Sequence, residues 1–228
     1  MQPFFLLFVF FSFSACSHAK NPDAALASAA GSIPKPASAK NISAIKPLII
    51  LDPGHGGYDI GARSQACEEK KVALQTTLLV KKYLSEMGYR ILLTRQDDTF
   101  IPLKKRAAIA NDANARLFVS IHYNAAKNQA ANGIEVYYYD KSSDWRISAS
   151  KRLGRCVLSR LLERTGAASR GVKGGNFLVI RETNMPAILI EGGFITHGAE
   201  RAKLKDSQYI EKVSRAIAEG VDRFFKTK

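Results

Sequence analysis

Short runs of apolar residues alternate along the chain with longer segments in which apolar residues recur every three or four positions. The short runs predict strands at 46–52, 89–95, 116–122, 133–139, 177–182 and 187–193. The longer segments predict helices at Glu69–Met87, Leu103–Ala115, Asp144–Thr165 and Gln208–Phe225. Strands that alternate with helices indicate an α/β fold, here a single domain with a twisted, largely parallel sheet of about six strands flanked by helices.

The first 45 residues do not follow this alternation. Residues 3–13, PFFLLFVFFSF, have the length of the apolar region of a signal peptide and are too short to span a bilayer. We therefore predict a signal peptide at 1–19. Within it, the sequence SAC resembles a lipoprotein processing site, with Cys16 as the lipid-modified residue. The sequence SHA that follows resembles an ordinary cleavage site, and either route exports the protein to the periplasm or cell envelope.

Residues 20–45 are rich in Ala, Ser and Pro and show no sustained apolar period. This composition predicts a flexible tether that reaches roughly 25–30 Å on average. Together with a lipid anchor, such a tether would hold the domain at 46–228 just off a membrane surface. Cys67 and Cys156 would then be the remaining thiols, and the sequence leaves open whether they pair or stay free.

The net charge of +14 favours an acidic polymeric partner, such as anionic lipid or a cell-wall glycan. Aromatic residues fall within the apolar patterns rather than among the basic residues. Nucleic-acid surfaces interleave the two kinds of side chain. We therefore expect no nucleic-acid partner.

Three predicted strands end in a side chain that can bind a metal or carry a proton. His55 follows the first strand, within LDPGHGGYDIGA, while His122 ends LFVSIH and Glu191 ends AILIE. The carboxyl ends of parallel strands meet at one edge of a sheet, where sites form in open α/β folds. A fourth candidate, Glu69, opens the first long helix.

Two histidines and one carboxylate form a common catalytic zinc set that leaves the fourth position for water. Zinc lowers the pKa of that water to about 7 and polarises the attacked carbonyl. A further carboxylate must move the proton of the water to the leaving group, and Glu191 suits this role. Alternatives stay open at this point: Glu68 competes with Glu69, Cys67 could be a soft ligand, and each histidine alone could be structural.

Several motifs together resemble the zinc-dependent N-acetylmuramoyl-L-alanine amidases of the Amidase_3 type. The resemblance runs in order from Lys46 to the end of the chain. The motifs are LDPGHGGYDIGA, EKKVAL, TRQDD, LKKRAAIAN, LFVSIHYNA, GIEVYY and PAILIEGGFIT.

The resemblance implies that His55, Glu69 and His122 bind one Zn²⁺ and that Glu191 is the catalytic glutamate. The implied reaction is hydrolysis of the amide that joins the lactyl group of N-acetylmuramic acid to L-alanine. Such enzymes remodel peptidoglycan, and some members act in cell division. The implied partner is therefore the glycan-peptide of the cell wall.

Other positions receive weaker roles from the same comparison. We expect Arg95 to support the sheet edge through an ion pair with Asp97 or Asp98. Asn124 is expected to line the site near His122. The motif GFITH ends in a histidine, His197, where the family usually has asparagine, and we expect a helix cap or a surface position rather than an extra ligand.

A long insertion characteristic of the cell-division members is missing from this sequence. In those proteins it follows the GIEVYY strand and folds into a segment that plugs the zinc site. Here only DKSSD, at 140–144, separates Tyr139 from Trp145. We therefore expect an open site that needs no activator protein.

A serine-based activity is a further alternative, because Ser-x-x-Lys opens the active-site motifs of penicillin-binding enzymes. The candidate matches to this motif are Ser148 with Lys151, on a predicted helix, and Ser43 with Lys46. The sequence KGG that starts at Lys173 is a loose echo of a second motif of those enzymes.

Two more alternatives keep the α/β scaffold. A zinc carboxypeptidase that trims stem peptides would need a basic group for a free carboxylate, and Arg170 or Lys173 could serve as that substrate-binding group. A cell-wall binding module would keep the basic surface without catalysis. The stretch NFLVIR fits the amidase pattern better than the carboxypeptidase pattern.

Overall fold

The structure is a computed structural model and describes residues 46–227. The predicted signal peptide and tether, with Cys16 and Ser43, lie outside the described residues and stay predictions. Within 46–227, none of the helices combines the length and apolar character that a membrane span requires.

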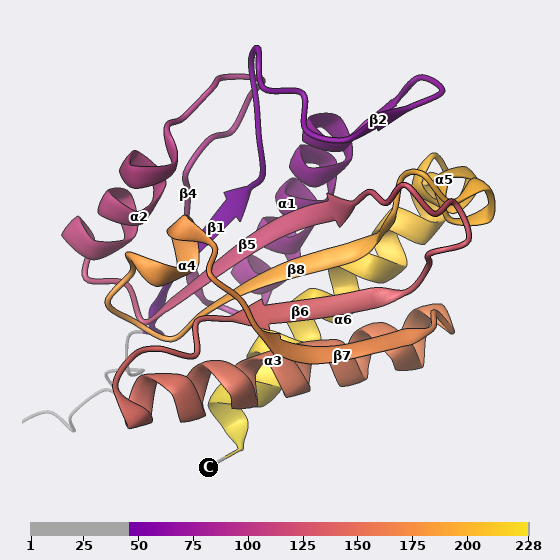
Figure 1. The fold of residues 1–228 in the computed structure, drawn as a ribbon. Coiled ribbons are helices and arrows are strands. Elements are labelled where there is room, and N and C mark those ends of the chain that lie inside the picture. The colour runs from indigo at the N-terminus through magenta and orange to yellow at the C-terminus, as the bar shows by residue number, and fades with distance from the viewer. Residues whose placement is uncertain (1–45, 228) are drawn as a thin grey trace, which may run out of the picture. The chain divides into compact units, whose positions relative to one another are not determined.

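A six-stranded sheet forms the centre of the domain, which confirms the predicted architecture (Figure 1). Its strands, in spatial order, are β4 (Arg90–Leu93), β1 (Leu48–Pro53), β5 (Leu117–Asn124), β8 (Ala187–Phe194), β6 (Ile134–Tyr138) and β7 (Ser169–Gly174). The first four strands run parallel to one another. Strand β6 pairs antiparallel with β8, and β7 pairs parallel with β6. A short hairpin of β2 (Arg63–Ser64) and β3 (Cys67–Glu68) stands apart.

Helices cover both faces of the sheet. The larger layer contains α1 (Glu69–Glu86), α3 (Asp144–Thr165) and α6 (Ser207–Lys226). The smaller layer contains α2 (Leu103–Asp112) and α4 (Leu178–Arg181), and α5 (Gly198–Leu204) precedes α6. All four predicted helices are thereby confirmed to within a few residues at their ends.

Alternating residues of the central strands divide between these two layers. Ile49 and Leu51 of β1 pack toward the larger layer, and Ile50 packs toward the smaller one. Because both faces are covered, these strands begin with consecutive apolar residues rather than with alternating apolar and polar ones. This is why the short apolar runs were readable as strands.

One predicted strand is wrong. The segment 177–182 instead contains the helix α4 (Leu178–Arg181), in which Arg181 N donates to Phe177 O and Glu182 N donates to Leu178 O. The guanidinium of Arg146, on α3, donates to the carbonyl of Ile180 and to the hydroxyl of Thr183. This buried tertiary contact stabilises a helical turn that the β-branched local sequence does not favour.

The sixth strand is instead β7, whose sequence is SRGVKG. It lies at the edge of the sheet and contains one large apolar residue, Val172. A strand at the edge, with little buried surface, produces no alternation of apolar residues that a sequence pattern could detect.

Candidate functional site

The carboxyl ends of β1, β5 and β8 bring three of the candidate side chains to one edge of the sheet. His122 on β5 lies directly opposite Glu191 on β8 in the strand register. His55 follows the end of β1, and Glu69 is the first residue of α1. The prediction that the ends of these strands meet at one edge of the sheet is therefore confirmed.

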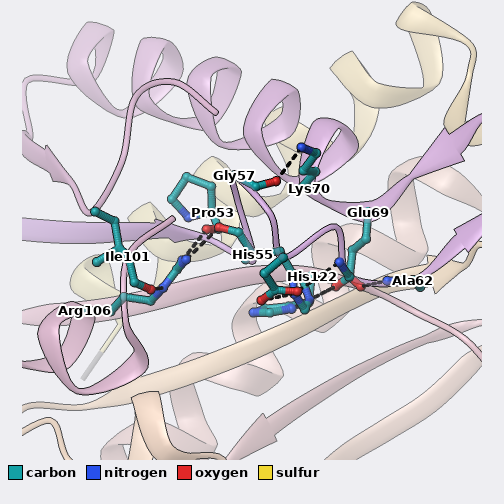
Figure 2. A network of polar contacts seen from close by, with 12 residues as sticks. Pro53, His55, Gly57, Ala62, Glu69, Lys70, Ile101, Arg106 and His122 are labelled. Atoms are coloured by element: carbon teal, nitrogen blue, oxygen red, sulfur yellow. Dashed lines mark hydrogen bonds and ion pairs between the residues drawn. The ribbon is translucent and has the colours of Figure 1, made fainter. Parts of the chain in front are cut away.

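His55, Glu69 and His122 form a compact cluster of metal-binding atoms (Figure 2). One ligand atom from each side chain lies within 4.8 Å of the others. Oε1 of Glu69 is 3.0 Å from Nε2 of His55 and 2.9 Å from Nδ1 of His122. The other ring nitrogen of His55, Nδ1, lies 2.9 Å from a carboxylate oxygen of Asp59, which fixes the orientation of the ring.

The glycines around His55 are required by close approach to the cluster. A Cβ atom on Gly54 would lie 2.3 Å from Cε1 of His122. At Gly61, whose φ is +65°, it would lie 2.5 Å from Oε2 of Glu69. His55 itself has a φ of 60°, a left-handed conformation that costs a non-glycine residue roughly 1 kcal/mol or more.

Arg106 of α2 binds the backbone of the loop that carries His55. Its side chain is 1% exposed, and it donates to the carbonyl oxygens of Pro53 and His55, both at 2.6 Å, and to that of Ile101 at 2.8 Å (Figure 2). Its Nη1 also lies 2.9 Å from Oδ1 of Asp52, which is fully buried. The guanidinium therefore ties the end of β1 to the backbone on both sides of it.

Arg95, which follows β4, binds the backbone of the same loop. It donates to the carbonyl oxygens of Pro53 at 3.1 Å, Gly54 at 2.6 Å and Lys70 at 2.9 Å. The expected ion pair of Arg95 with Asp97 or Asp98 is wrong: among residues 46–227 the guanidinium pairs with neither carboxylate, and of these two residues it reaches only the backbone carbonyl of Asp97. The carboxylate of Asp98 instead pairs with Lys70 at 2.7 Å. Buried carbonyl oxygens needed donors more than the exposed carboxylates did.

Glu191 lies beside the cluster with an unsatisfied oxygen. Its Oε2 is buried and has no hydrogen-bond partner among residues 46–227. Burial raises the pKa of Glu191 well above the ordinary value, and the charges of Glu69 and Glu135 raise it further. An unpaired buried carboxylate carries a free-energy cost, which makes Glu191 a candidate for a functional position.

Glu69 has the opposite electrostatic situation. Burial would raise its pKa, but hydrogen bonds with His122 and His55 outweigh burial, and the net shift is downward. The pKa of His55 is lowered by burial and raised more strongly by Glu69 and Asp59, so its net shift is upward. The pKa shifts thus favour the ionised form of Glu69 and the protonated form of Glu191, so Glu69 is suited to bind a cation and Glu191 to bind a proton.

Glu135 of β6 lies opposite Glu191 on the other side of β8. It is 2% exposed and accepts hydrogen bonds from Lys173 at 2.7 Å, Arg170 at 3.0 Å and Asn124 at 2.7 Å. The structure thus gathers the three predicted substrate-binding residues around one carboxylate. Burial raises the pKa of Glu135, but the hydrogen bonds from Lys173, Tyr137 and Arg170 shift it downward overall.

A pocket of about 460 Å³ opens over the cluster. Its polar lining comes from His55, Glu69, His122, Asn124 and Glu191. Its apolar wall is built by residues of α4 and its neighbours: Leu103, Phe177, Leu178, Val179 and Leu189. The predicted position of Asn124 beside His122 therefore agrees with this lining.

Other candidate residues lie away from the pocket. Ser148 is exposed on α3, with Lys151 one turn further along, and Lys46 is exposed and donates to the carbonyl of Met87. Neither Ser-x-x-Lys sequence contributes to the pocket lining among the described residues. His197 is the N-cap of α5, where its ring accepts a hydrogen bond from the backbone N of Glu200. Cys67 and Cys156 are both free thiols.

Three site residues escaped the sequence analysis. Asp59 carried a weak signal, as an acidic residue four positions after His55. Glu135 carried a stronger one, because a carboxylate inside the buried strand GIEVYY requires polar partners. Arg106 carried none that distinguishes it from its basic neighbours in LKKR.

The donor set fits zinc on chemical grounds. Two imidazole nitrogens and one carboxylate oxygen converge, and the unsatisfied oxygen of Glu191 lines the same pocket. Three protein ligands with an open position are typical of catalytic rather than structural zinc sites. The fold and the geometry of this site are typical of the class of α/β metallohydrolases.

Comparisons with known proteins place the chain more narrowly. Residues 49–223 match the Amidase_3 family model, described as N-acetylmuramoyl-L-alanine amidase. The chain is 37% identical over 178 residues to the N-acetylmuramoyl-L-alanine amidase LytC of Bacillus subtilis, which covers 78% of this chain and 35% of LytC. It is also 37% identical over 177 residues to YqiI of the same organism, with 78% and 84% covered.

Solved structures give the same result. The N-acetylmuramoyl-L-alanine amidase of Clostridium difficile 630 matches with a TM-score of 0.76 and 38% identity, over 81% of this chain and 99% of that one. The catalytic domain of CwlV from Bacillus (Paenibacillus) polymyxa matches with a TM-score of 0.73 and 37% identity, over 80% and 99%. The chain belongs to the Amidase_3 family of N-acetylmuramoyl-L-alanine amidases, and it spans about a third of the length of LytC.

Proposed function

We propose that this protein is a zinc-dependent peptidoglycan hydrolase that cleaves the amide between N-acetylmuramic acid and the L-alanine of the stem peptide. The observation that carries the proposal is the pocket in which His55, Glu69 and His122 converge beside the unpaired carboxylate of Glu191. Membership of the family supplies the substrate class.

Nε2 of His55, a carboxylate oxygen of Glu69 and Nδ1 of His122 would hold one Zn²⁺. When bound, the ion supplies Lewis acidity toward the lactyl carbonyl and a water of lowered pKa. Asp59 keeps the ring of His55 in place through Nδ1. Gly54 and Gly61 let the backbone approach closely enough for the three ligands to meet.

Glu191 carries the proton. As the water attacks the lactyl carbonyl, Glu191 accepts its proton, and it then donates this proton to the nitrogen of L-alanine while the C–N bond breaks. Burial, which raises the pKa of this carboxyl, helps it to retain the proton between the two steps. The apolar wall from α4 limits the access of bulk water to the reacting atoms.

Arg170 and Lys173 act here on Glu135, and through it on the edge of the site. Both remain more than a third exposed, so the solvent side of each cation is available to the acidic stem peptide. Because Glu135 already neutralises part of their charge, neither is a cation dedicated to a free terminal carboxylate, which makes the carboxypeptidase alternative weaker. The exposed position of Ser148 makes the serine-based alternative weaker as well.

The connection between β6 and α3 consists of residues 139–143, so we propose that the site is open and that turnover needs no activator protein. One relative, LytH of Staphylococcus epidermidis, is named a probable cell wall amidase, and we propose an exported enzyme of the cell envelope. Acylation of Cys16 and the tether at 20–45 would attach it to a membrane.

Product analysis distinguishes the candidate reactions. The zinc-loaded chain is incubated alone with purified peptidoglycan, and the soluble products are identified by mass spectrometry. We expect intact stem peptides with a free L-alanine amino terminus, and none after chelation or in Glu191→Gln. Release of D-alanine alone would support the carboxypeptidase, and binding without any release would support the binding module.

A further inference from the structure

A second groove lies at the opposite edge of the sheet from the candidate site. Its volume is about 600 Å³, within the roughly 300–1,000 Å³ typical of ligand sites. It is formed where β5 and β8 begin, at the end of α2 and the start of α3, on the left of Figure 1. The residues that matter most in this groove are Asn114, Arg116, Trp145, Arg152, Asn184 and Phe224.

Trp145 is the most unusual residue of this groove. It is the only tryptophan of the chain, and 58% of its surface is exposed. Folding alone gives no reason to leave the largest aromatic side chain in water, because burial of its apolar surface would stabilise the domain. Exposed indole rings are typical of surfaces that contact a ligand.

The rest of the groove combines an apolar floor with a polar rim. Met185 and Pro186 form buried parts of the floor. Phe224 is buried beneath the guanidinium of Arg152, whose Cζ lies 4.0 Å from the ring centroid. Arg152 is held there because its Nη1 donates to the carbonyl of Phe224 at 2.9 Å.

Asn114, Arg116 and Asn184 supply the free polar groups of the rim. All three are exposed, and within residues 46–227 their side chains make no hydrogen bond or ion pair. The backbone of Asn184 is fixed nonetheless, because its N donates to Oδ1 of Asn111 at 2.9 Å. The rim side chains therefore expose hydrogen-bond donors and acceptors to solvent, and the backbone that carries Asn184 is held in place.

The chemistry of this lining fits a sugar. A pyranose ring has an apolar face that stacks on an indole and a polar edge of hydroxyl and acetamido groups that bond to amides. The described lining residues include two arginines and no acidic residue. This charge favours a saccharide that carries carboxylates, and amidase action leaves a free lactyl carboxylate on every muramic acid that it strips.

We propose that this groove is a second glycan-binding site, which takes a short segment of N-acetylated glycan and prefers the strand already stripped of its peptides. Trp145 stacks on a sugar ring, the amides of Asn114 and Asn184 bond to its polar edge, and Arg116 pairs with the lactyl carboxylate. The preference for stripped strands rests on the proposed function, whereas the binding of sugar does not.

The distance between the two sites gives the groove a use. At about 3.3 Å per residue, β5 separates Arg116 from His122 by roughly 20 Å. An enzyme held on stripped glycan by this groove remains close to uncut stem peptides of the same polymer. The second contact raises the effective concentration of substrate without any change in the catalytic pocket.

The single tryptophan allows a direct test. The full chain carrying Glu191→Gln, which removes turnover, is titrated with N-acetylchitotetraose and with glycan strands stripped of peptides, while the fluorescence of Trp145 is followed. We expect a saturable change with both probes. Asn184→Ala should weaken both three- to tenfold, and Arg116→Ala should weaken only the carboxylated strands.

Two controls make the result specific. Arg155→Ala removes an exposed arginine of α3 outside the groove and should leave both affinities unchanged. In otherwise wild-type enzyme, Trp145→Ala should reduce peptide release from intact peptidoglycan at least threefold, while turnover of a small soluble muramyl peptide stays the same.

The proposal is overturned if Trp145 fluorescence responds to neither probe while the wild-type enzyme releases stem peptides. It is also overturned if Trp145 emits as a buried indole before sugar is added, since another segment of the chain would then fill the groove. Sugar binding without any peptide release would instead leave the groove standing and contradict the proposed function.

Discussion

Replacing Arg106 by methionine tests whether the buried guanidinium is what holds the His55 loop. Methionine keeps an unbranched apolar stem but removes the donors that Pro53 O, His55 O and Ile101 O now share. It also leaves Asp52, fully buried, without a charged partner, although Thr94 and Ser120 still donate to its carboxylate.

The magnitude follows from these contacts. Breaking a buried ion pair by removing one partner costs about 3–5 kcal/mol, and the two remaining hydroxyl donors place Asp52 toward the lower end. The carbonyl oxygens of His55 and Ile101 also lose their donor, whereas Pro53 O keeps Arg95, so we expect the free energy of unfolding to fall by about 4 kcal/mol. For a domain of this size that lowers Tm by roughly 8–16 °C.

The assay is thermal unfolding of the wild type, Arg106→Met, and the double variant Asp52→Asn with Arg106→Met. The double variant should recover at least about 1 kcal/mol, because it no longer contains an unpaired buried carboxylate. Arg155→Met, on an exposed face of α3, is the matched control and should stay within about 0.5 kcal/mol of the wild type. A Tm loss below about 3 °C in Arg106→Met, or no recovery in the double variant, would refute the reasoning.

Three further predictions concern the cluster and its neighbour. Gly54→Ala puts a Cβ 2.3 Å from the ring of His122, so the ring must move. Zinc affinity, measured by chelator competition, should therefore fall more than about 100-fold. Unchanged affinity would contradict the steric argument. Asp59→Asn should weaken zinc binding by about 10–100-fold in the same assay, because the carboxylate no longer orients His55. Glu135→Gln should lower stability above pH 4.5, where the depressed pKa of Glu135 makes its ionised form stabilising. The difference between this variant and the wild type in the free energy of unfolding, measured in urea, should shrink as the pH falls from 4.5 through the pKa of Glu135 in the folded state. A difference that stays constant with pH would exclude a contribution from ionised Glu135.

The layered fold was predictable because burial of both sheet faces leaves a simple pattern. Runs such as PLIIL are apolar at every position, and α3 and α6 repeat apolar residues at helical spacing. Edge and tertiary effects leave no such pattern. β7 has only Val172 to bury, and α4 is helical because Arg146 binds its carbonyl oxygens.

The candidate site was partly predictable for a topological reason. His55, His122 and Glu191 each stand at the end of an apolar run, and parallel strands bring such ends together. The choice of Glu69 over Glu68 needed the family resemblance, since both flank the start of α1.

The supporting residues were not predictable in the same way. Arg95 and Arg106 act on backbone carbonyl oxygens that only the folded loop presents, and a local pattern cannot show which arginine will meet them. For Arg95 the nearby aspartates suggested an ion pair, but the buried carbonyl groups compete successfully for its donors.

The most direct test of the account is the position of the oxygen that water adds. The zinc-loaded wild type and Glu191→Gln are each incubated with a purified muramyl peptide in ¹⁸O-labelled water, and the products are fragmented in a mass spectrometer. We predict that the wild type places ¹⁸O in the lactyl carboxylate of muramic acid. Glu191→Gln should bind zinc equally and form this product at least about 100-fold more slowly. Label at a new carboxyl terminus of the peptide, or full turnover by Glu191→Gln, would contradict the account.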